Sequence, residues 1–211
     1  MPRIIQKAVY KFEELSDAAK EKARQWWRES DDACYLDSVI SDFETIADLI
    51  GLELSTRSVP LMNGKTRQKP EVYYSVSYCQ GDYAAFTGTW RYKKGCLKAI
   101  KAYASVDAIL HKIVSDFQAV QKRYFYQLVT QCSERRGNQY VNEVVKAGYS
   151  RYDEQAVDRE TERDVENIVD RLSSWLYTQL RAEVDYRNSD EQVDEMLTVN
   201  EYEFTENGEI A

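Results

Sequence analysis

Residues 71–92 contain two consecutive segments in which apolar and polar side chains alternate, a pattern that an extended chain satisfies and a helix does not. In the first segment, 71–79, one face carries Val72, Tyr74, Val76 and Tyr78. A turn of Gln80, Gly81, Asp82 and Tyr83 leads into the second segment, where one side carries Phe86, Trp90 and Tyr92. We therefore expect an antiparallel hairpin at the centre of a sheet. Gly88 within its second strand indicates a bulge or the close approach of another backbone.

The rest of the chain mixes helical and extended patterns. Apolar residues at helical spacing predict helices over 16–29, from Asp31 or Asp32 to Ile50, over 105–136 and over 158–186. Shorter extended segments are expected at 4–12, 52–55, 140–152 and 197–204. Gly51 stands where a glycine commonly ends a helix. These elements predict an α+β fold in which an antiparallel β-sheet packs against several amphipathic α-helices. Glycine-rich strand-to-helix turns, which a doubly wound parallel sheet would require, are missing.

Charge divides the chain unevenly. Residues 1–150 contain 22 basic and 18 acidic residues, whereas residues 151–211 contain 6 and 18. We expect an α+β core domain over 1–150, with an acidic helix and a C-terminal strand over 151–211 packed on it. The first residues, 1–7, lack the apolar run of a signal peptide, and the apolar runs elsewhere are too short to cross a bilayer. A cytoplasmic protein without a membrane partner is expected.

The sequence contains no recognisable catalytic centre. His111 is the single histidine, which argues against zinc sites that need several and leaves one candidate for a nucleophile–base pair. Four scattered cysteines, at 34, 79, 96 and 132, form no Cys-x-x-Cys pair and are expected to be reduced. Neither a phosphate-binding loop nor a dinucleotide-binding glycine motif is present. We expect a protein that is not an enzyme and that uses no cofactor or metal.

Two groups of residues are candidates for binding. The first is the aromatic hairpin, with Tyr74, Tyr78, Gln80, Asp82 and Tyr83. Tyrosines on a sheet offer a large contact area at low entropic cost, which favours packing and protein contact over nucleic acid. Asp82 either faces a ligand from the tip of the hairpin or stabilises the tight turn.

The second group comprises Glu160, Asp164 and Glu166 on the predicted helix over 158–186. Acids one turn apart can hold a divalent ion. However, Arg159 and Arg163 alternate with them, which is typical of a solvated, salt-bridged helix face.

Residues 56–70 form a loop or hairpin tip, with Asn63 and Gly64 as the turn signal. The segment contains four basic residues and no acid: Arg57, Lys65, Arg67 and Lys69. It is either a phosphate-contacting loop or an exposed mobile loop without a ligand.

Three segments of the chain form a distinctive set. They are residues 9–24, beginning Val-Tyr-Lys-Phe-Glu-Glu-Leu-Ser-Asp; residues 74–86, containing Tyr-Ser-Val-Ser-Tyr-Cys-Gln-Gly-Asp with Ala84 and Phe86; and residues 94–101, Lys-Gly-Cys-Leu-Lys-Ala-Ile-Lys. Together these segments resemble a family of small bacteriophage and prophage proteins, some of them labelled antitoxin-like. Tyr83 stands where the turn of that family has a second glycine. The resemblance implies a phage origin, and accessory phage proteins of this size often bind host machinery or block a defence system.

Three functions remain open. The leading hypothesis is a non-enzymatic phage protein that inhibits a host or defence protein, one that handles nucleic acid, through the hairpin and an acidic, DNA-mimicking surface. Direct nucleic-acid binding is not expected on this hypothesis, and the protein could be a homodimer. The first alternative is a nucleic-acid-binding or antitoxin-like regulator that uses the basic 57–69 segment. The second is a metal-dependent hydrolase built on carboxylates.

Overall fold

The computed structural model describes residues 7–30, 36–62, 64–78, 80–135, 141–149 and 157–211, with the backbone alone for 134–135 and 141–149. It divides into two compact units: unit 1 comprises residues 1–36 and 182–211, and unit 2 comprises residues 37–181. This division differs from the expected boundary at residue 150. The reason is helix α5 (Arg159–Arg187), which contributes its residues up to Arg181 to unit 2.

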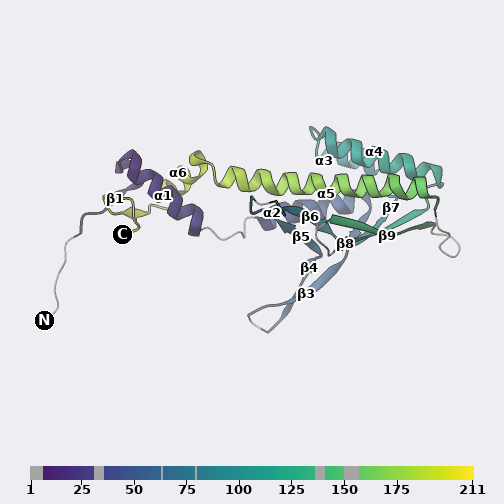
Figure 1. Cartoon of the computed structure of the whole chain (residues 1–211), viewed down its shortest axis with the longest axis horizontal. Helices are drawn as coiled ribbons and strands as arrows, with labels where there is room; N and C mark the ends of the chain where they lie inside the picture. Colours follow the sequence, from purple (N-terminus) through teal and green to yellow (C-terminus); the bar gives the residue numbers. More distant parts are fainter. Residues whose placement is uncertain (1–6, 31–35, 63, 79, 136–140, 150–156) are drawn as a thin grey trace. The chain divides into compact units, whose positions relative to one another are not determined.

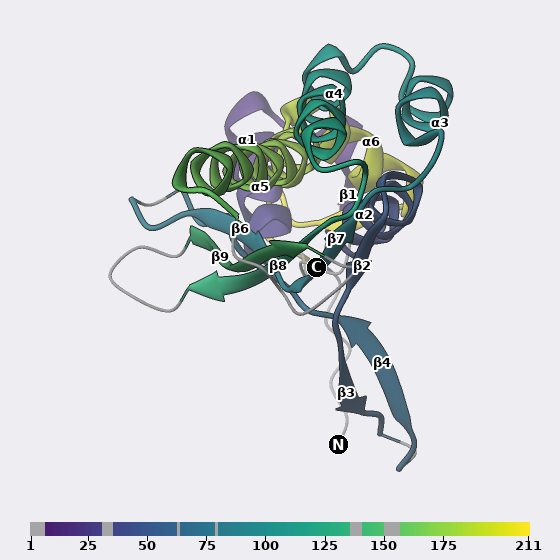
Figure 2. The ribbon, with the colours of Figure 1, turned by 90° about the vertical axis from the view of Figure 1, so that its right-hand side faces the viewer.

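Unit 2 is built on a four-stranded antiparallel sheet in the order β2-β7-β8-β9. Its strands are β2 (Leu52–Leu54), β7 (Gly88–Arg91), β8 (Leu128–Arg135) and β9 (Val141–Tyr149). The helices of unit 2 besides α5 are α2 (Leu36–Ile50), α3 (Cys96–Tyr103) and α4 (Ala108–Arg123). Helices α4 and α5 lie on the same side of the sheet (Figures 1 and 2). The predicted α+β fold, with antiparallel sheets packed against helices, is confirmed.

Trp90 lies at the centre of the core of unit 2. Its side chain is completely buried. Its indole ring stacks on Phe117 of α4, with ring centroids 3.8 Å apart, and its Nε1 donates a hydrogen bond of 3.0 Å to the Ile50 carbonyl at the end of α2. One side chain of the sheet therefore contacts two helices, and its polar atom is satisfied at the same time.

The predicted hairpin forms, but its second strand is divided. Strand β5 (Val72–Ser75) pairs with β6 (Tyr83–Phe86) in a two-stranded sheet of their own. After Thr87 the chain continues as β7, which pairs instead with β2 and β8. The expected apolar-aromatic face of the first strand is also only partly buried, because Val72 is buried and Tyr74 is exposed.

The division occurs at a junction where three strand pairs meet. Ser55, Glu71 and Thr87 form a closed ring of backbone hydrogen bonds: Ser55 N–H donates to Thr87 O (2.8 Å), Thr87 N–H to Glu71 O (2.9 Å), and Glu71 N–H to Ser55 O (2.7 Å). The pairs that leave this ring are β2–β7, β5–β6, and β3 (Thr56–Pro60) with β4 (Thr66–Pro70). Each of the three linking residues thus satisfies its backbone groups while the chain changes partner.

Gly88, the residue after Thr87, is required by this crowding. A β-carbon at position 88 would lie 2.5 Å from the backbone oxygen of Glu53 and 3.1 Å from the α-carbon of Leu54. The close backbone approach predicted from the sequence is confirmed.

The helix predicted over 105–136 is wrong in its second half. Helix α4 begins after Asp107, whose carboxylate accepts a hydrogen bond of 2.8 Å from Leu110 N–H, and it ends at Arg123. Phe125 and Tyr126 then adopt positive φ angles of 51° and 62°, which stop the helix, and strand β8 follows. The apolar period continued past the helix end because one face of β8 is also buried, at Leu128, Thr130 and Cys132.

Unit 1 joins the two ends of the chain. It contains β1 (Tyr10–Lys11), the 3-10 turn η1 (Phe12–Glu14), α1 (Asp17–Ser30), α6 (Asp190–Val199) and β10 (Glu203–Phe204). Strand β1 pairs with β10 in antiparallel fashion. The buried core consists of Phe12, Leu15, Ala19, Ala23, Val193, Leu197 and Phe204. The strand predicted over 197–204 is wrong for residues 197–199, which complete α6. The strand predicted over 4–12 is confirmed only at Tyr10 and Lys11. Residues 1–6 lie outside the described residues.

Ion pairs join the two helices of unit 1. The Arg24 guanidinium of α1 binds both oxygens of Asp194 on α6, at 2.6 and 2.8 Å. Arg28 also binds Asp190. A bidentate pair of this kind sets the relative position of the two helices more strictly than a single charged contact.

Within the described residues, every helix is either too short or too polar to span a bilayer.

We expect the substitution Gly88→Ala to destabilise the protein by about 1–3 kcal/mol, because the added methyl group has no space beside β2. Urea denaturation measures the change. Gly81→Ala is the matched control: a β-carbon there meets no atom within 4 Å, so the effect should stay within about 0.5 kcal/mol. Equal stability of Gly88→Ala and the wild type would contradict the tight junction.

The start of α5 should give a pH-dependent contribution to stability. Hydrogen bonds to Asp158 from the Tyr124 hydroxyl (2.6 Å) and from Thr161 N–H (2.9 Å) lower the pKa of this carboxyl from 3.8 to about 2. Because the pKa is lower in the folded state, the stabilisation is complete above about pH 4 and is lost as the pH falls toward 2. Asp158→Asn keeps a capping group and should remove this part of the pH dependence, as measured by urea denaturation between pH 2 and 5. An NMR titration that gives Asp158 an ordinary pKa in the folded protein would contradict the assignment.

Candidate functional site

The β3–β4 ribbon leaves the three-way junction and projects from the rest of unit 2 (Figures 1 and 2). Its two strands pair in regular antiparallel register, from Thr56 opposite Pro70 to Pro60 opposite Thr66. The turn closes through hydrogen bonds from Leu61 N–H to Lys65 O (2.7 Å) and from Gly64 N–H to Leu61 O (3.0 Å). Gly64 has a φ of +76°, in the left-handed region that favours glycine. Of the two structures predicted for residues 56–70, a loop or a hairpin tip, the hairpin with its turn at Gly64 is confirmed. Asn63 lies outside the described residues.

All four basic residues of the ribbon belong to one face. Residues directly opposite each other in an antiparallel pair share a face, and so do residues two apart along one strand. Arg57 is opposite Lys69, and Val59 is opposite Arg67. Lys65 lies two residues before Arg67 and continues this face toward the turn. We refer to Arg57, Lys65, Arg67 and Lys69 as the basic face.

The opposite face is uncharged. It carries Thr56, Ser58, Pro60, Thr66, Gln68 and Pro70. The Gln68 amide donates a hydrogen bond of 2.8 Å to the Ser58 hydroxyl directly across the ribbon. Neither face of the ribbon contains a fully buried residue, so backbone pairing and the junction hold it rather than a hydrophobic core.

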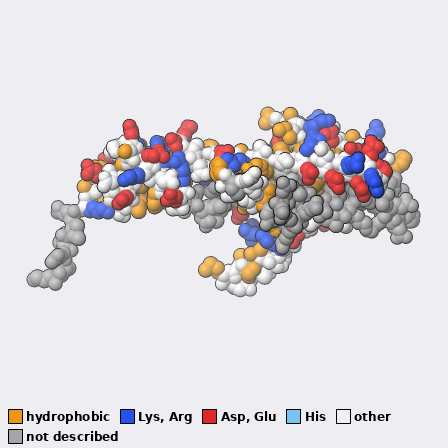
Figure 3. Space-filling view, in the orientation of Figure 1, with side chains coloured by type: hydrophobic (Ala, Val, Ile, Leu, Met, Phe, Trp, Pro, Cys, Tyr) orange, Lys and Arg blue, Asp and Glu red, His pale blue; other side chains and the backbone are white. Residues whose placement is uncertain are grey.

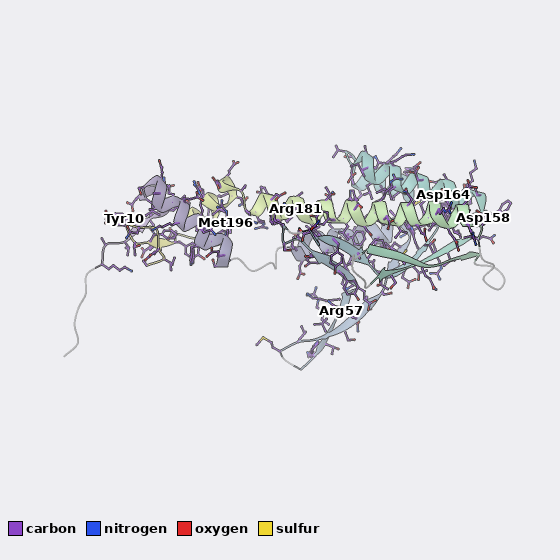
Figure 4. The ribbon with its side chains drawn as sticks, viewed as in Figure 1. Tyr10, Arg57, Asp158, Asp164, Arg181 and Met196 are labelled. Carbon is purple, nitrogen blue, oxygen red and sulfur yellow. The ribbon has the colours of Figure 1, made fainter. Side chains whose placement is uncertain are left out.

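The basic face has an electrostatic cost in the free protein. Like charges directly across a strand pair repel each other, as Arg57 and Lys69 do. Two contacts at the base of the ribbon offset this cost in part. The Arg57 guanidinium lies 5.6 Å from the centroid of the Tyr73 ring, and Lys69 forms an exposed ion pair of 3.8 Å with Asp37. The position of Arg57 on the ribbon is shown in Figure 4. A polyanion would relieve the remaining repulsion.

The free end of the ribbon is apolar, as Figure 3 shows by the hydrophobic side chains at its end. Leu61 is 42% exposed and Met62 is fully exposed. Pro60 precedes them and is also exposed. A basic face thus leads to an apolar tip within a segment that has no acidic residue.

The carboxylate of Asp82 is not presented at the tip of the aromatic hairpin, as a ligand-binding role would require; it is bonded within the loop. The Asp82 side chain is 6% exposed. One carboxylate oxygen accepts hydrogen bonds from Ser77 N–H (2.9 Å), the Ser77 hydroxyl (3.0 Å) and the Ser75 hydroxyl (3.2 Å), and the other accepts one from Tyr78 N–H (2.9 Å). The geometry therefore supports a structural role in which the carboxylate organises the loop between β5 and β6.

Arg181 of α5 attaches this loop to the helix. Its guanidinium lies 3.5 Å from the centroid of the Tyr78 ring and 3.8 Å from the carboxylate of Asp82. Tyr78 has a φ of 60°, an uncommon conformation for a non-glycine residue. Sequence reasoning missed Arg181, since nothing in its local sequence indicates a partner about 100 residues away.

The other three hairpin candidates are separated by the pairing. Tyr74 is opposite Ala84 and is exposed, whereas Tyr83 is opposite Ser75 and is half-buried. Gln80 is exposed in the turn. These residues line neither a described cavity nor one continuous face.

Glu160 and Asp164 are one turn apart on one face of α5, but Glu166 does not share this face, so the three acidic candidates form no single group. Asp164 forms an ion pair with Arg123 of α4, and Glu160 is exposed one turn before it. Glu166 is two residues from Asp164, a spacing that places the two side chains on different sides of a helix. Figure 4 shows Asp164 and Arg181 well separated along α5, consistent with about 25 Å for 17 residues, so the acids also lie far from the hairpin.

Arg171 and Asp116 continue the pairing between these helices, at 2.7 Å, beside an open groove of about 360 Å³. The ion pairs Arg123–Asp164 and Arg171–Asp116 make this surface a contact between α4 and α5. The sequence predicted instead a solvated face of α5 alone, in which Arg159 and Arg163 pair with the acids. Among the described residues, no three His, Cys, Asp or Glu side chains come together as a metal site would require.

The histidine and the two described cysteines, which are the other residues that could take part in catalysis, are held in structural roles. A ring nitrogen of His111 lies 2.8 Å from the Ala104 carbonyl, within hydrogen-bond distance. Cys96 and Cys132 are buried free thiols, and burial raises the pKa of Cys132 to about 12, which keeps it protonated and unreactive. Cys34 and Cys79 lie outside the described residues.

A family model described as Domain of unknown function (DUF8835) matches residues 35–190, well over half of the chain. The chain belongs to this family. No curated protein and no solved structure matches it. The family domain spans the whole of unit 2, so it includes the ribbon, the junction and the Asp82 loop, whereas most of unit 1 lies outside it.

We expect Asp82→Ala to destabilise this family domain by on the order of 2–3 kcal/mol, because hydrogen bonds to a carboxylate are lost and Arg181 loses its ion pair. Urea denaturation measures the loss, and hydrogen exchange should accelerate at the amides of Ser77 and Tyr78. Glu44→Ala, which removes an exposed acid from α2, is the control with a small expected effect. Unchanged exchange at both amides would contradict the organising role of Asp82.

Proposed function

We propose that this protein is a non-enzymatic nucleic-acid-binding protein that contacts the phosphate backbone of duplex nucleic acid through the basic face of the β3–β4 ribbon. The observation that carries the proposal is the placement of Arg57, Lys65, Arg67 and Lys69 on one face of a projecting ribbon that contains no acid. This develops the regulator hypothesis from the sequence, because the same four residues now share one surface.

The length of the ribbon suits contact with the phosphate backbone of a duplex. Five paired residues at about 3.3 Å each give a length of about 17 Å, so several phosphates can be contacted along it. Arginine and lysine supply most of the affinity in such interfaces by displacing condensed counterions.

The net acidity of the chain does not lie on the unit that bears the ribbon. Unit 1 contains eight basic and seventeen acidic residues, whereas unit 2 contains twenty and nineteen. Charges further away than about 8 Å are largely screened at physiological salt. The local charge of the ribbon, rather than the total of −8, therefore governs its first contact with a polyanion.

We expect the full-length protein to bind a duplex of about 30 base pairs with a salt dependence that reflects these contacts. A plot of log K against log salt should have a slope between about −3 and −4 for four contacts. The double substitution Arg57→Ala with Arg67→Ala should weaken binding and reduce the magnitude of the slope by about 2. Fluorescence anisotropy of a labelled duplex at several salt concentrations measures both quantities.

Lys98→Ala with Lys101→Ala is the matched control, because it removes two exposed positive charges from α3 in the same unit. This control should leave the slope within about 0.5 of the wild-type value. Equal losses in the two double variants would show that binding follows total charge and not the ribbon. Absence of salt-dependent duplex binding would refute the proposal.

The concentration of acid in unit 1 favours a second candidate, the phage-encoded inhibitor of a host or defence protein. Asp190 and Asp194 are engaged by arginines, so exposed acids such as Glu191 and Glu206 would form its contact surface. On this hypothesis Glu191→Gln with Glu206→Gln weakens capture of a basic bacterial partner, whereas the ribbon variant captures it normally. The reverse result would leave the ribbon as the binding element.

A further inference from the structure

The tip of the ribbon has a chemistry that phosphate binding does not explain. Turns exposed to solvent commonly use glycine, asparagine, aspartate and serine. The turn sequence here contains Asn63 and Gly64, but the two residues before them are Leu61 and Met62, both exposed, and the Met62 side chain is fully accessible to water. Two large apolar side chains therefore lie at the end of the ribbon, level with and just beyond Lys65, the basic residue nearest the turn.

We propose that Leu61 and Met62 form a wedge that enters the minor groove and inserts between neighbouring base pairs, so that the bound duplex is unstacked and bent. The inference rests on the proposed function and specifies its substrate as stacked duplex DNA. Apolar side chains of this kind, including leucine, methionine and proline, are those that proteins insert between base steps.

The arrangement of the ribbon allows both contacts at once. Leu61 continues the alternation Arg57, Val59, Leu61, and its N–H donates a hydrogen bond to the Lys65 carbonyl across the turn. Leu61 therefore belongs to the basic face, and Met62 follows it at the turn. The ribbon is about 17 Å long, more than twice the depth of the minor groove, which is about 7.5 Å. The tip can thus reach the base pairs while the basic face remains near the phosphates beside the groove.

Charge complementarity selects the occupant. Residues 56–70 contain four cations and no acid. This charge complements a polyanion better than it complements a protein groove that carries both positive and negative groups. A polyanion that also accepts apolar side chains between its layers is stacked nucleic acid. An anionic lipid surface shares the negative charge, so the experiment includes it as a separate probe.

The experiment uses the full chain and a duplex of about 30 base pairs labelled at its ends with a donor and an acceptor fluorophore. Saturating protein should raise the energy transfer between the ends, because bending shortens the distance between them. A duplex with a two-nucleotide bulge is already unstacked, and it should bind at least about tenfold more tightly than the continuous duplex. Vesicles containing anionic lipid form the third probe and should compete only weakly.

The test variant is Leu61→Ser with Met62→Ser, and Met62→Gln is a milder companion. Both positions are exposed, so the variants should keep the circular dichroism spectrum and the denaturation midpoint of the wild type. We expect them to bind the continuous duplex within about threefold of the wild type while losing the rise in energy transfer and the preference for the bulge. Ser58→Ala on the uncharged face of the ribbon is the control and should bend DNA normally.

Each contrary outcome has a distinct meaning. Salt-dependent duplex binding by the wild type without a change in energy transfer would overturn the wedge and leave the proposed function standing. Normal bending by the double serine variant would also overturn the wedge. Failure of the wild type to bind any duplex, or a preference for the vesicles, would overturn the proposed function together with the inference.

Discussion

The closed ring of backbone hydrogen bonds between Ser55, Glu71 and Thr87 is the constraint on which the architecture of unit 2 depends. At this ring the chain changes strand partner three times without leaving a linking peptide group unpaired. Because the ring includes the entry to β3 and the exit from β4, it sets the direction in which the ribbon leaves the sheet. Gly88 allows the ring to close, since its missing β-carbon makes room for the backbone of β2.

The rest of unit 2 holds this junction in place. Trp90, two residues after Gly88, anchors β7 against Phe117 and the end of α2. On the other side, the loop that joins β5 to β6 is organised by Asp82 and attached to α5 through Arg181. Both strands that continue from Glu71 and Thr87 are thus tied to helices. A ribbon without its own core can therefore project as an ordered element, because the junction at its base adjoins the buried residues Val72, Phe86 and Gly88.

The division of the molecule also separates its charge. The family match covers unit 2, which is nearly neutral and bears the basic ribbon, whereas most of the acidic excess belongs to unit 1. An overall charge of −8 thus describes neither unit, and a prediction of partners from that total alone would miss the ribbon. Within unit 2, the basic face and the apolar tip follow one another on a single hairpin. This order is consistent with an element that first meets a charged backbone and then an apolar, layered interior.

Local patterns in the sequence determined the elements whose signals are short-range. The period of α2 and its terminating Gly51, the alternation at Val72 and Phe86, the helix over 158–186 and the turn at Gly64 were all readable, since each depends on neighbouring residues. The same patterns failed at the end of α4, where the apolar period passes from a helix into β8 without interruption. They left Asp82 between a ligand site and a turn-stabilising role, because a turn sequence does not reveal which way a carboxylate points. Only the tertiary structure decided that Thr87 divides one apparent strand between two sheets, that Arg181 closes the Asp82 loop, and that four scattered basic residues share one face. Those outcomes depend on register and on contacts between residues far apart in the chain, which no local pattern encodes.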